Sequence, residues 1–431
     1  MLLLMYLVGI LASTNAEDLT NSIEKIPKLN PTDKIQHIPE LLTLASPDDA
    51  TLTTMELISK YGYKGELHKV TTADGYILEL HRIKGRTDNS TDLKVQKPVA
   101  LVMHGLLCDS STWVLAGREK SLGFILADEG YDVWLGNARG TTYARNHKSR
   151  KTLKSKKDFW NFSWHEIGTR DLPAMIDYIV KTTGRQKMFY LGHSQGTTAF
   201  FVMASERPEY QKYIEEMYAM APIAYCGRMK SPFMQLLAQF TLTMEIMGQL
   251  FGIYEFNPTN DFIKAVQRLV CAEKAITQPI CSNVMFLVAG FNEEQFDPAL
   301  LPIILGHVPA SNSLKQLVHY GQLIKSGTLF LPGRFKHFDY GLFGNKDLYG
   351  TLTPPNYNLT KITAPIHVYY SENDWLANVQ DVEKLYSELG NPSGKTLVAD
   401  KKFNHLDYLW AKDANKIVYE PIISAMKKKS T

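Results

Sequence analysis

The stretch Lys187-Met-Phe-Tyr-Leu-Gly-His-Ser-Gln-Gly-Thr-Thr-Ala-Phe-Phe-Val-Met-Ala-Ser205 decides the fold. It begins with a short apolar run, Met188 to Leu191, that is typical of a buried strand, and apolar residues recur at helical spacing from Ala199 onward. Between the two runs lies Gly192-His-Ser-Gln-Gly196, which we interpret as a sharp strand-to-helix turn. A serine on such a turn projects its hydroxyl from the sheet edge, so Ser194 is a candidate nucleophile.

Short apolar runs on both sides of this turn predict the other strands of a sheet. Alternating residues at 66–71 and 76–83 predict a hairpin, and further strands are predicted at 98–103, 131–135, 216–221, 366–370 and 396–403. Helical segments are expected between several of them, for example at 120–129. Strands that alternate with helices imply parallel crossovers. We therefore predict an α/β fold, with a mostly parallel central sheet that helices cover on both faces.

The strand pattern stops between Pro222 and Pro355, which predicts a mainly helical cap inserted into the sheet. The expected organisation is a first core part at 51–222, the cap at 223–355 and a second core part at 356–431. The cap contains the apolar stretch Phe233 to Phe251. Such a helix is either simply core or a mobile lid with an apolar inner face, and both interpretations stay open.

The N-terminus predicts entry into the secretory route. Met1 to Leu11 is apolar and too short to span a bilayer, and small residues follow it up to Ala16, so residues 1–16 are interpreted as a signal peptide. Residues 17–50 are polar and contain prolines, and a loosely ordered leader or prosegment is expected there. No later segment has the pattern of a transmembrane span. We expect a secreted protein, with the lysosome lumen as the alternative.

Composition excludes several classes of protein. Of the 431 residues, 45% are hydrophobic and 21% charged, which excludes a disordered chain. The net charge is +3 and no basic stripe carries interleaved aromatics, so no nucleic-acid partner is expected. The pattern calls for no cofactor and no metal. Three acceptor sequons make Asn89, Asn161 and Asn358 candidates for N-glycosylation, although the aromatic neighbours of Asn161 predict its burial.

A serine nucleophile needs a base that takes its proton and an acid that orients the base. In α/β-hydrolases these groups follow in the chain order Ser, Asp or Glu, His. Asp374 follows the predicted strand 366–370 and is the candidate acid, with Glu372 as runner-up. His405 follows the last predicted strand and is the candidate general base.

Acyl transfer also needs two donors for the oxyanion. We assign the backbone N–H groups of Leu106, which follows the strand 98–103, and of Gln195, which follows the nucleophile. His104 and His193 are expected to support these two loops by hydrogen bonding and not to transfer protons.

Six segments resemble the animal acid lipases, the gastric and lysosomal acid lipase family; they are His104-Gly-Leu-Leu107, Asp132 to Gly140, Phe159 to Trp164, Asp171 to Ala174, Gly192 to Gly196 and Asn404 to Trp410. The resemblance covers roughly Leu52 to Ala425. It implies an α/β-hydrolase that cleaves neutral-lipid esters at a lipid–water interface, with Ser194, Asp374 and His405 as its triad and Leu106 and Gln195 as its oxyanion donors. It also implies a disulfide between Cys271 and Cys281 in the cap. The pairing of Cys108 and Cys226 stays open.

Other functions share these residues. A general carboxylesterase, an acyltransferase and a non-catalytic lipid carrier on the same fold are the alternatives. A carrier should have lost a triad residue, and none is lost here, whereas an acyltransferase would form the same acyl-enzyme. The sequence leaves open whether triacylglycerols, sterol esters or small esters are preferred, and it leaves the oligomeric state unknown.

Overall fold

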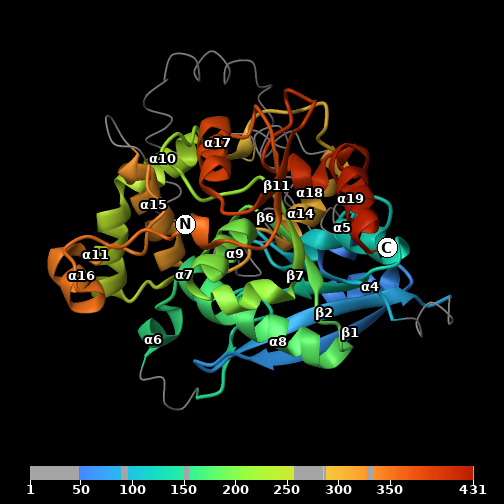
Figure 1. Cartoon of the computed structure of the whole chain (residues 1–431), viewed down its shortest axis with the longest axis horizontal. Coiled ribbons are helices and arrows are strands. Elements are labelled where there is room, and N and C mark those ends of the chain that lie inside the picture. Colours follow the sequence, from blue (N-terminus) through green and yellow to red (C-terminus); the bar gives the residue numbers. More distant parts are fainter. Residues whose placement is uncertain are drawn as a thin grey trace, which may run out of the picture.

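The computed structural model describes residues 48–88, 96–149, 155–256, 285, 288–327 and 333–430 (Figure 1). Within them the chain folds around a nine-stranded sheet of order β1-β2-β4-β3-β6-β7-β10-β11, with β5 paired to β2. The strands are β1 (Tyr63–Thr71), β2 (Tyr76–Arg86), β3 (Val99–Met103), β4 (Asp132–Gly136), β5 (Asn146–His147), β6 (Met188–His193), β7 (Ile214–Met220), β10 (Ile366–Tyr370) and β11 (Pro392–Leu397).

The hairpin β1–β2 is antiparallel, β2 pairs antiparallel with β4, and all pairs from β4 to β11 are parallel. The predicted fold class is therefore confirmed. The helices of the core are η2 (Asp48–Ala50), α4 (Thr54–Lys60), η4 (Ser110–Trp113), α5 (Leu122–Asp128), α6 (Lys156–Trp160), α7 (Trp164–Glu166), η5 (Ile167–Asp171), α8 (Leu172–Thr183), α9 (Gln195–Glu206), η6 (Pro208–Tyr213), η8 (Leu359–Lys361), α17 (Val379–Glu388), α18 (Asp407–Trp410), η9 (Asn415–Tyr419) and α19 (Glu420–Ser430).

The last strand differs from the prediction. The sequence predicted residues 396–403, but β11 ends at Leu397 and a turn follows, in which Asp400 accepts hydrogen bonds from the backbone N–H groups of Lys402 and Phe403. β11 is an edge strand whose residues are mostly exposed, so its sequence lacks the apolar pattern of a buried strand.

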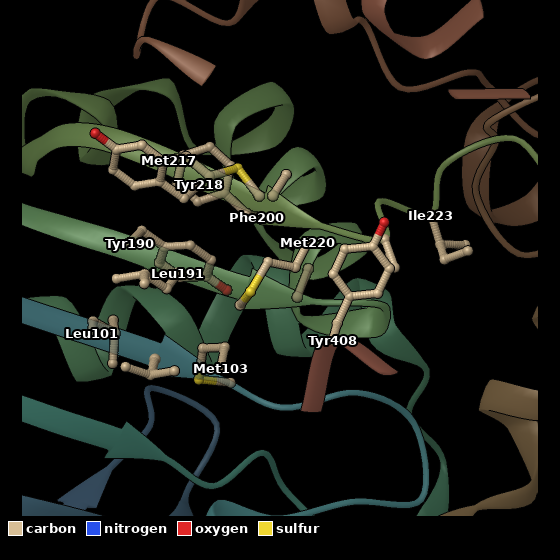
Figure 2. Close-up of a cluster of buried hydrophobic side chains, with 14 of the residues drawn as sticks. Leu101, Met103, Tyr190, Leu191, Phe200, Met217, Tyr218, Met220, Ile223 and Tyr408 are labelled. Atoms are coloured by element: carbon tan, nitrogen blue, oxygen red, sulfur yellow. The ribbon is translucent and has the colours of Figure 1, made fainter. Parts of the chain in front are cut away.

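Part of the core is formed by β6 and α9, the two elements that flank the turn carrying Ser194, together with β3 and β7. Figure 2 shows the buried side chains that fill it; they are Leu101 and Met103 of β3, Tyr190 and Leu191 of β6, Met217, Tyr218 and Met220 of β7, Phe200 of α9, and Ile223 and Tyr408. Residues 195–205 of α9 are all buried. Since burying a large apolar side chain contributes about 1.5–3 kcal/mol, α9 is held firmly against the sheet, and the position of the turn is fixed with it.

The segment between β7 and β10 is mainly helical where it is described. It contains α10 (Pro232–Gln239), α11 (Thr241–Phe251), η7 (Pro298–Leu300), α14 (Leu301–His307), α15 (Leu314–Ser326), α16 (Gly341–Tyr349) and the short pair β8 (Glu255–Phe256) and β9 (Asn312–Ser313). In Figure 1, α10, α11, α15 and α16 lie together on the left, away from the hairpin β1–β2. The domain boundaries assigned from the sequence stay predictions. Among the described residues, no helix combines the length and apolar character needed to cross a bilayer.

The last residues of the expected leader, Asp48–Ala50, contact the folded part of the chain. Residues 1–47 lie outside the described part, but η2 is held in place: Asp49 accepts from Lys60 at 2.6 Å, and the Asp49 carbonyl accepts from His307 Nε2 at 2.8 Å. A Cβ on Gly306 would come within 2.1 Å of the Ala50 carbonyl oxygen. The end of segment 17–50 is therefore packed against α14, which the sequence analysis did not anticipate.

Candidate active site

Ser194 lies in the turn between β6 and α9, in a conformation that non-glycine residues rarely adopt. Its φ is 52° and its ψ is −118°. Such strain costs on the order of 1–3 kcal/mol and persists only where the surroundings enforce it. Here the Ser194 N–H donates to the Met220 carbonyl at 3.1 Å, and the Ser194 carbonyl accepts from Thr197 N–H at 2.9 Å and Thr197 Oγ1 at 2.6 Å.

Two glycines let α9 approach the sheet closely. A Cβ on Gly196 would lie 2.5 Å from the Met103 carbonyl oxygen, and a Cβ on Gly192 would lie 3.0 Å from the Gly196 carbonyl carbon. Larger residues at these positions would push the helix away from β3. The first and last residues of the pentapeptide are thus fixed by packing, independently of any chemistry.

The candidate acid and base form a buried pair. His405 Nδ1 lies 2.8 Å from Asp374 Oδ2, and because a carboxylate only accepts, Nδ1 carries the proton. Asp374 Oδ1 also accepts the backbone N–H groups of Leu376 at 2.8 Å and Ala377 at 2.7 Å. Both side chains are almost fully buried. Glu372, the runner-up, is exposed in the same loop, so Asp374 is the carboxylate that pairs with His405.

The other ring nitrogen of His405, Nε2, makes no hydrogen bond to the described residues. It is buried, and the hydrogen bond to Ser194 Oγ that a resting triad would contain is not formed. The two loops are nevertheless tied together, since His193 Nε2 donates to the His405 carbonyl at 2.9 Å and the two rings lie 4.8 Å apart.

His104 and His193 make structural hydrogen bonds. His104 Nδ1 donates to the Gly105 carbonyl at 2.8 Å, and its Nε2 accepts the Ala138 N–H at 3.2 Å. Burial lowers the pKa of His104; burial together with the neighbouring His405 holds the pKa of His193 well below its usual range. Both rings bond to backbone groups, whereas His405 bonds to a carboxylate.

The two candidate oxyanion donors belong to loops that meet at Ser194. A Cβ on Gly105, one residue before Leu106, would lie 3.2 Å from Ser194 Cβ. Neither the Leu106 N–H nor the Gln195 N–H has a hydrogen-bond partner in the described part of the chain. The next residue, Leu107, has a φ of 60°, and its carbonyl accepts the N–H of Ala310, from the segment between β7 and β10, at 2.6 Å.

A second polar cluster beside His405 was not found from the sequence. The Ala289 carbonyl in the cap segment accepts the N–H of Trp375 at 3.2 Å and of His405 at 3.4 Å, so it joins the acid loop to the base loop. Asp407 Oδ2 accepts from the Asn404 N–H and from Asn292 Nδ2, both at 2.7 Å. Burial raises the pKa of Asp407 to about 7. The motif containing Asn404 and Asp407 was visible in the sequence, but Ala289 and Asn292, which contact it from the segment between β7 and β10, carry no recognisable signal.

The other predicted site residues fall outside this centre. Cys271, Cys281 and Asn89 lie outside the described residues, so the disulfide stays a prediction. Asn161 and Asn358 are exposed, and the expectation that Asn161 is buried was wrong. Cys108 and Cys226 are buried free thiols, so these two cysteines do not form a disulfide.

This arrangement can support nucleophilic acyl transfer. It combines a partly exposed hydroxyl on a strained turn, an imidazole oriented by a carboxylate, and two unpaired backbone N–H groups.

Comparison with known proteins identifies the family. Residues 54–117 match a family model described as a partial alpha/beta-hydrolase lipase region, and residues 101–262 match the alpha/beta hydrolase fold. A solved chain from Sulfolobus solfataricus has a TM-score of 0.50 at 15% identity, covering 82% of this chain and 90% of that chain, which shows the fold alone.

Relatives match over most of their length. The chain is 42% identical to Lipase 1 of Drosophila melanogaster (88% of this chain, 81% of the relative). It is 38% identical to the gastric triacylglycerol lipase of Bos taurus (89% and 93%) and 38% identical to the lysosomal acid lipase/cholesteryl ester hydrolase of Homo sapiens (90% and 93%). The chain thus belongs to the gastric and lysosomal acid lipase family of α/β-hydrolases and is a carboxylic ester hydrolase of the lipase class.

Proposed function

We propose that this lipase hydrolyses the ester bonds of neutral lipids, triacylglycerols and sterol esters, through an acyl-enzyme on Ser194. The relatives include a triacylglycerol lipase and a cholesteryl ester hydrolase, which supports both substrate classes. The observation that carries the proposal is the buried Asp374–His405 pair, which leaves His405 Nε2 unpaired beside the strained serine turn.

The mechanism assigns one role to each group. As Ser194 Oγ bonds to the ester carbonyl carbon, His405 Nε2 takes the hydroxyl proton, and the Leu106 and Gln195 N–H groups donate to the oxyanion. The carbon–oxygen bond to the alcohol then breaks, and His405 returns the proton to the departing alcohol. Water attacks the acyl-enzyme with His405 again as base, which releases the fatty acid and restores Ser194. Asp374 holds the His405 tautomer throughout.

The missing Ser194–His405 hydrogen bond is consistent with these roles. Catalytic hydrogen bonds are often long in the free enzyme and tighten when substrate binds. The backbone of the turn and the Asp374–His405 pair are both held by hydrogen bonds, which leaves the Ser194 side chain as the group that is free to move.

We place the protein in the secretory route, either exported or retained in the lysosome lumen. The apolar N-terminal segment 1–16 supports entry into that route. The exposure of Asn161 and Asn358 supports their glycosylation there.

Replacing Ser194 by alanine tests the nucleophile. Ser194→Ala should lower kcat by about 10⁴-fold or more while lipid binding persists, because the hydroxyl forms the covalent bond but contributes little packing. Ser387→Ala, at an exposed serine of α17, is the control and should keep wild-type activity. A Ser194→Ala protein with more than about a tenth of the wild-type rate would refute the assignment.

A substrate panel tests the reaction class. Rates are compared on emulsified triacylglycerol, emulsified sterol ester and a soluble short-chain ester, with and without an added alcohol. Transfer of most acyl groups to the added alcohol would identify an acyltransferase, and equal efficiency on the soluble ester would identify a general carboxylesterase.

A further inference from the structure

The cap carries almost all of the exposed hydrophobic side chains in the described part of the chain. All but three of the large ones lie within 240–253 and 340–352, on and beside α11 and α16; the exceptions are Leu67, Phe291 and Leu397. Leu250 of α11 is 72% exposed and Phe343 of α16 is 85% exposed. Figure 1 shows both helices on the left of the molecule. Such a concentration marks an interaction surface, since scattered exposed residues would need no explanation.

A groove with a volume of about 830 Å³ opens between these two segments. One wall is α11 and the turn after it, the other is residues 338–341, and α15 forms the floor. Its apolar lining comes from Leu242, Met244, Ile253, Leu314, Val318 and Phe338. The volume lies within the range of small-molecule sites.

Lys315 of α15 places a cation in the groove. Its Nζ donates to Asn161 Oδ1 at 2.9 Å and to the Tyr340 hydroxyl at 2.8 Å, both neutral groups. It also lies 4.9 Å and 4.8 Å from the ring centres of Phe338 and Tyr340. An ammonium has three N–H donors, so one has no partner in the part of the chain that the structure describes. Among the described residues no carboxylate lies within ion-pair distance of Lys315, whereas Lys336 of the same groove pairs with Asp339.

The acidic residues of the groove are engaged elsewhere. Asp339 forms an ion pair with Lys336 at 3.1 Å and accepts from Asn345 Nδ2 at 2.7 Å. Burial and the charge of Asp339 raise the pKa of Glu245, against the opposing charges of Lys315 and Lys325. The lining lysines are Lys157, Lys315, Lys325 and Lys336. The groove is therefore apolar along its walls and positive on balance.

α15 separates the groove from the catalytic centre. Lys315 and Val318 face the groove, whereas Gln316 on the opposite face accepts a hydrogen bond from Gln195 Nε2 at 2.7 Å. Tyr320 lies 3.0 Å from Thr198 Oγ1 of α9, also on the catalytic side. The groove and Ser194 are thus on two sides of one helix.

We propose that this groove is a second binding site, for a long-chain fatty-acid anion whose carboxylate pairs with Lys315 and whose hydrocarbon chain lies along α11 and Phe338. The inference rests on the proposed function, because a fatty acid is the product of that reaction. The exposed side chains of α11 and α16 then lie in the lipid phase around the groove. Occupation of the groove holds the enzyme on droplets where product has already accumulated.

Direct binding to protein with a blocked nucleophile tests the proposal. Ser194 is modified with a long-chain alkyl phosphonate, so that the catalytic pocket is filled, and binding of a dansyl-labelled long-chain fatty acid is followed by fluorescence. We expect the labelled fatty acid to bind saturably. Oleate should displace it at a concentration about 10-fold lower than oleyl alcohol, because only oleate offers a charge-assisted contact to Lys315. Lys315→Met should weaken oleate binding by about 10-fold, and Lys181→Met, at an exposed lysine of α8, should not.

A second pair of variants guards against local unfolding in Lys315→Met. Leu242→Asp adds a negative charge at the exposed rim and should also weaken binding, whereas Leu397→Asp, at an exposed leucine of β11, should not. Absence of saturable binding to the blocked protein, equal affinities in Lys315→Met and Lys181→Met, or equal displacement by oleyl alcohol would overturn the proposal. Because the assay measures binding and not turnover, a negative result would contradict the binding site without contradicting ester hydrolysis. If Ser194 were not the nucleophile, the phosphonate would not modify it.

Discussion

Asp407 should contribute more to the stability of the protein in acid than at neutral pH. Its carboxylate is buried two residues after His405, and its hydrogen-bond donors among the described residues are the Asn404 N–H and Asn292 Nδ2. Burial raises its pKa from an ordinary value of 3.8 to about 7. Between these two values the folded protein binds a proton that the unfolded chain does not bind.

The sign and size of the effect follow from that difference. The contribution of Asp407 to the free energy of unfolding should rise as pH falls through about 7 and should level off below about 4, once this residue is protonated in the unfolded chain as well. A pKa difference of about 3 corresponds to about 4 kcal/mol over this window. The protonated carboxyl leaves Asp374 as the negative charge that pairs with His405. Acid conditions would thus strengthen the loop that carries the base.

Asp407→Asn isolates the contribution, because the amide keeps the shape of the side chain but cannot titrate. Urea unfolding is measured at several pH values from about 4 to about 8. From about pH 8 to about pH 4, the free energy of unfolding of the wild type should increase by about 4 kcal/mol more than that of Asp407→Asn. Asp347→Asn, at an exposed carboxylate of α16, should follow the wild type throughout. Parallel stability curves for the wild type and Asp407→Asn would refute the reasoning.

Three further predictions concern the cap, the disulfide and the serine turn. A short-chain ester should be hydrolysed slowly below its solubility limit and much faster once droplets form, because opening a cap with an apolar inner face costs roughly 25 cal/mol per Å² unless lipid receives that surface. A smooth hyperbolic dependence through the limit would favour an open site. Cys271 and Cys281 should be linked, with a stabilisation of about 2.5–3 kcal/mol, and two free thiols in a non-reduced digest analysed by mass spectrometry would contradict this. Gly196→Ala should cost about 1–3 kcal/mol in thermal unfolding and lower kcat, because its Cβ would lie 2.5 Å from the Met103 carbonyl oxygen. In the control, Gly333→Ala, the new Cβ meets its nearest atom at 3.4 Å and should be tolerated.

The sequence predicts well those features that neighbouring residues determine together. The turn at Ser194 lies between an apolar strand and an apolar helix, and both flanks are local in the chain. Asp374 was found because it follows a buried strand, and His405 because the chain order of the three groups is fixed in this fold. The strand that precedes His405 was misplaced, since an exposed edge strand carries no apolar period.

Contacts between distant segments could not be predicted. Ala289 joins the loops of Trp375 and His405 through its carbonyl group, and a backbone carbonyl leaves no trace in the sequence. The exposure of Asn161 was missed for a related reason. Its neighbours Trp160 and Phe162 are buried, but the chain turns at the end of α6 and directs the amide outward toward Lys315.

The order in which the sheet is assembled from the chain has a consequence for biosynthesis. β7 pairs with β10, yet the whole cap must be synthesised between them, so β7 is an open edge until Ile366 to Tyr370 has been made. An unpaired apolar strand edge is prone to association with other chains. The segment that contains Ser194 and the unpaired edge of β7 is therefore synthesised long before His405. A ribosome-bound or truncated chain that lacks His405 is expected to be inactive and to need protection by chaperones. Activity is expected only after the segment that contains His405 has been synthesised.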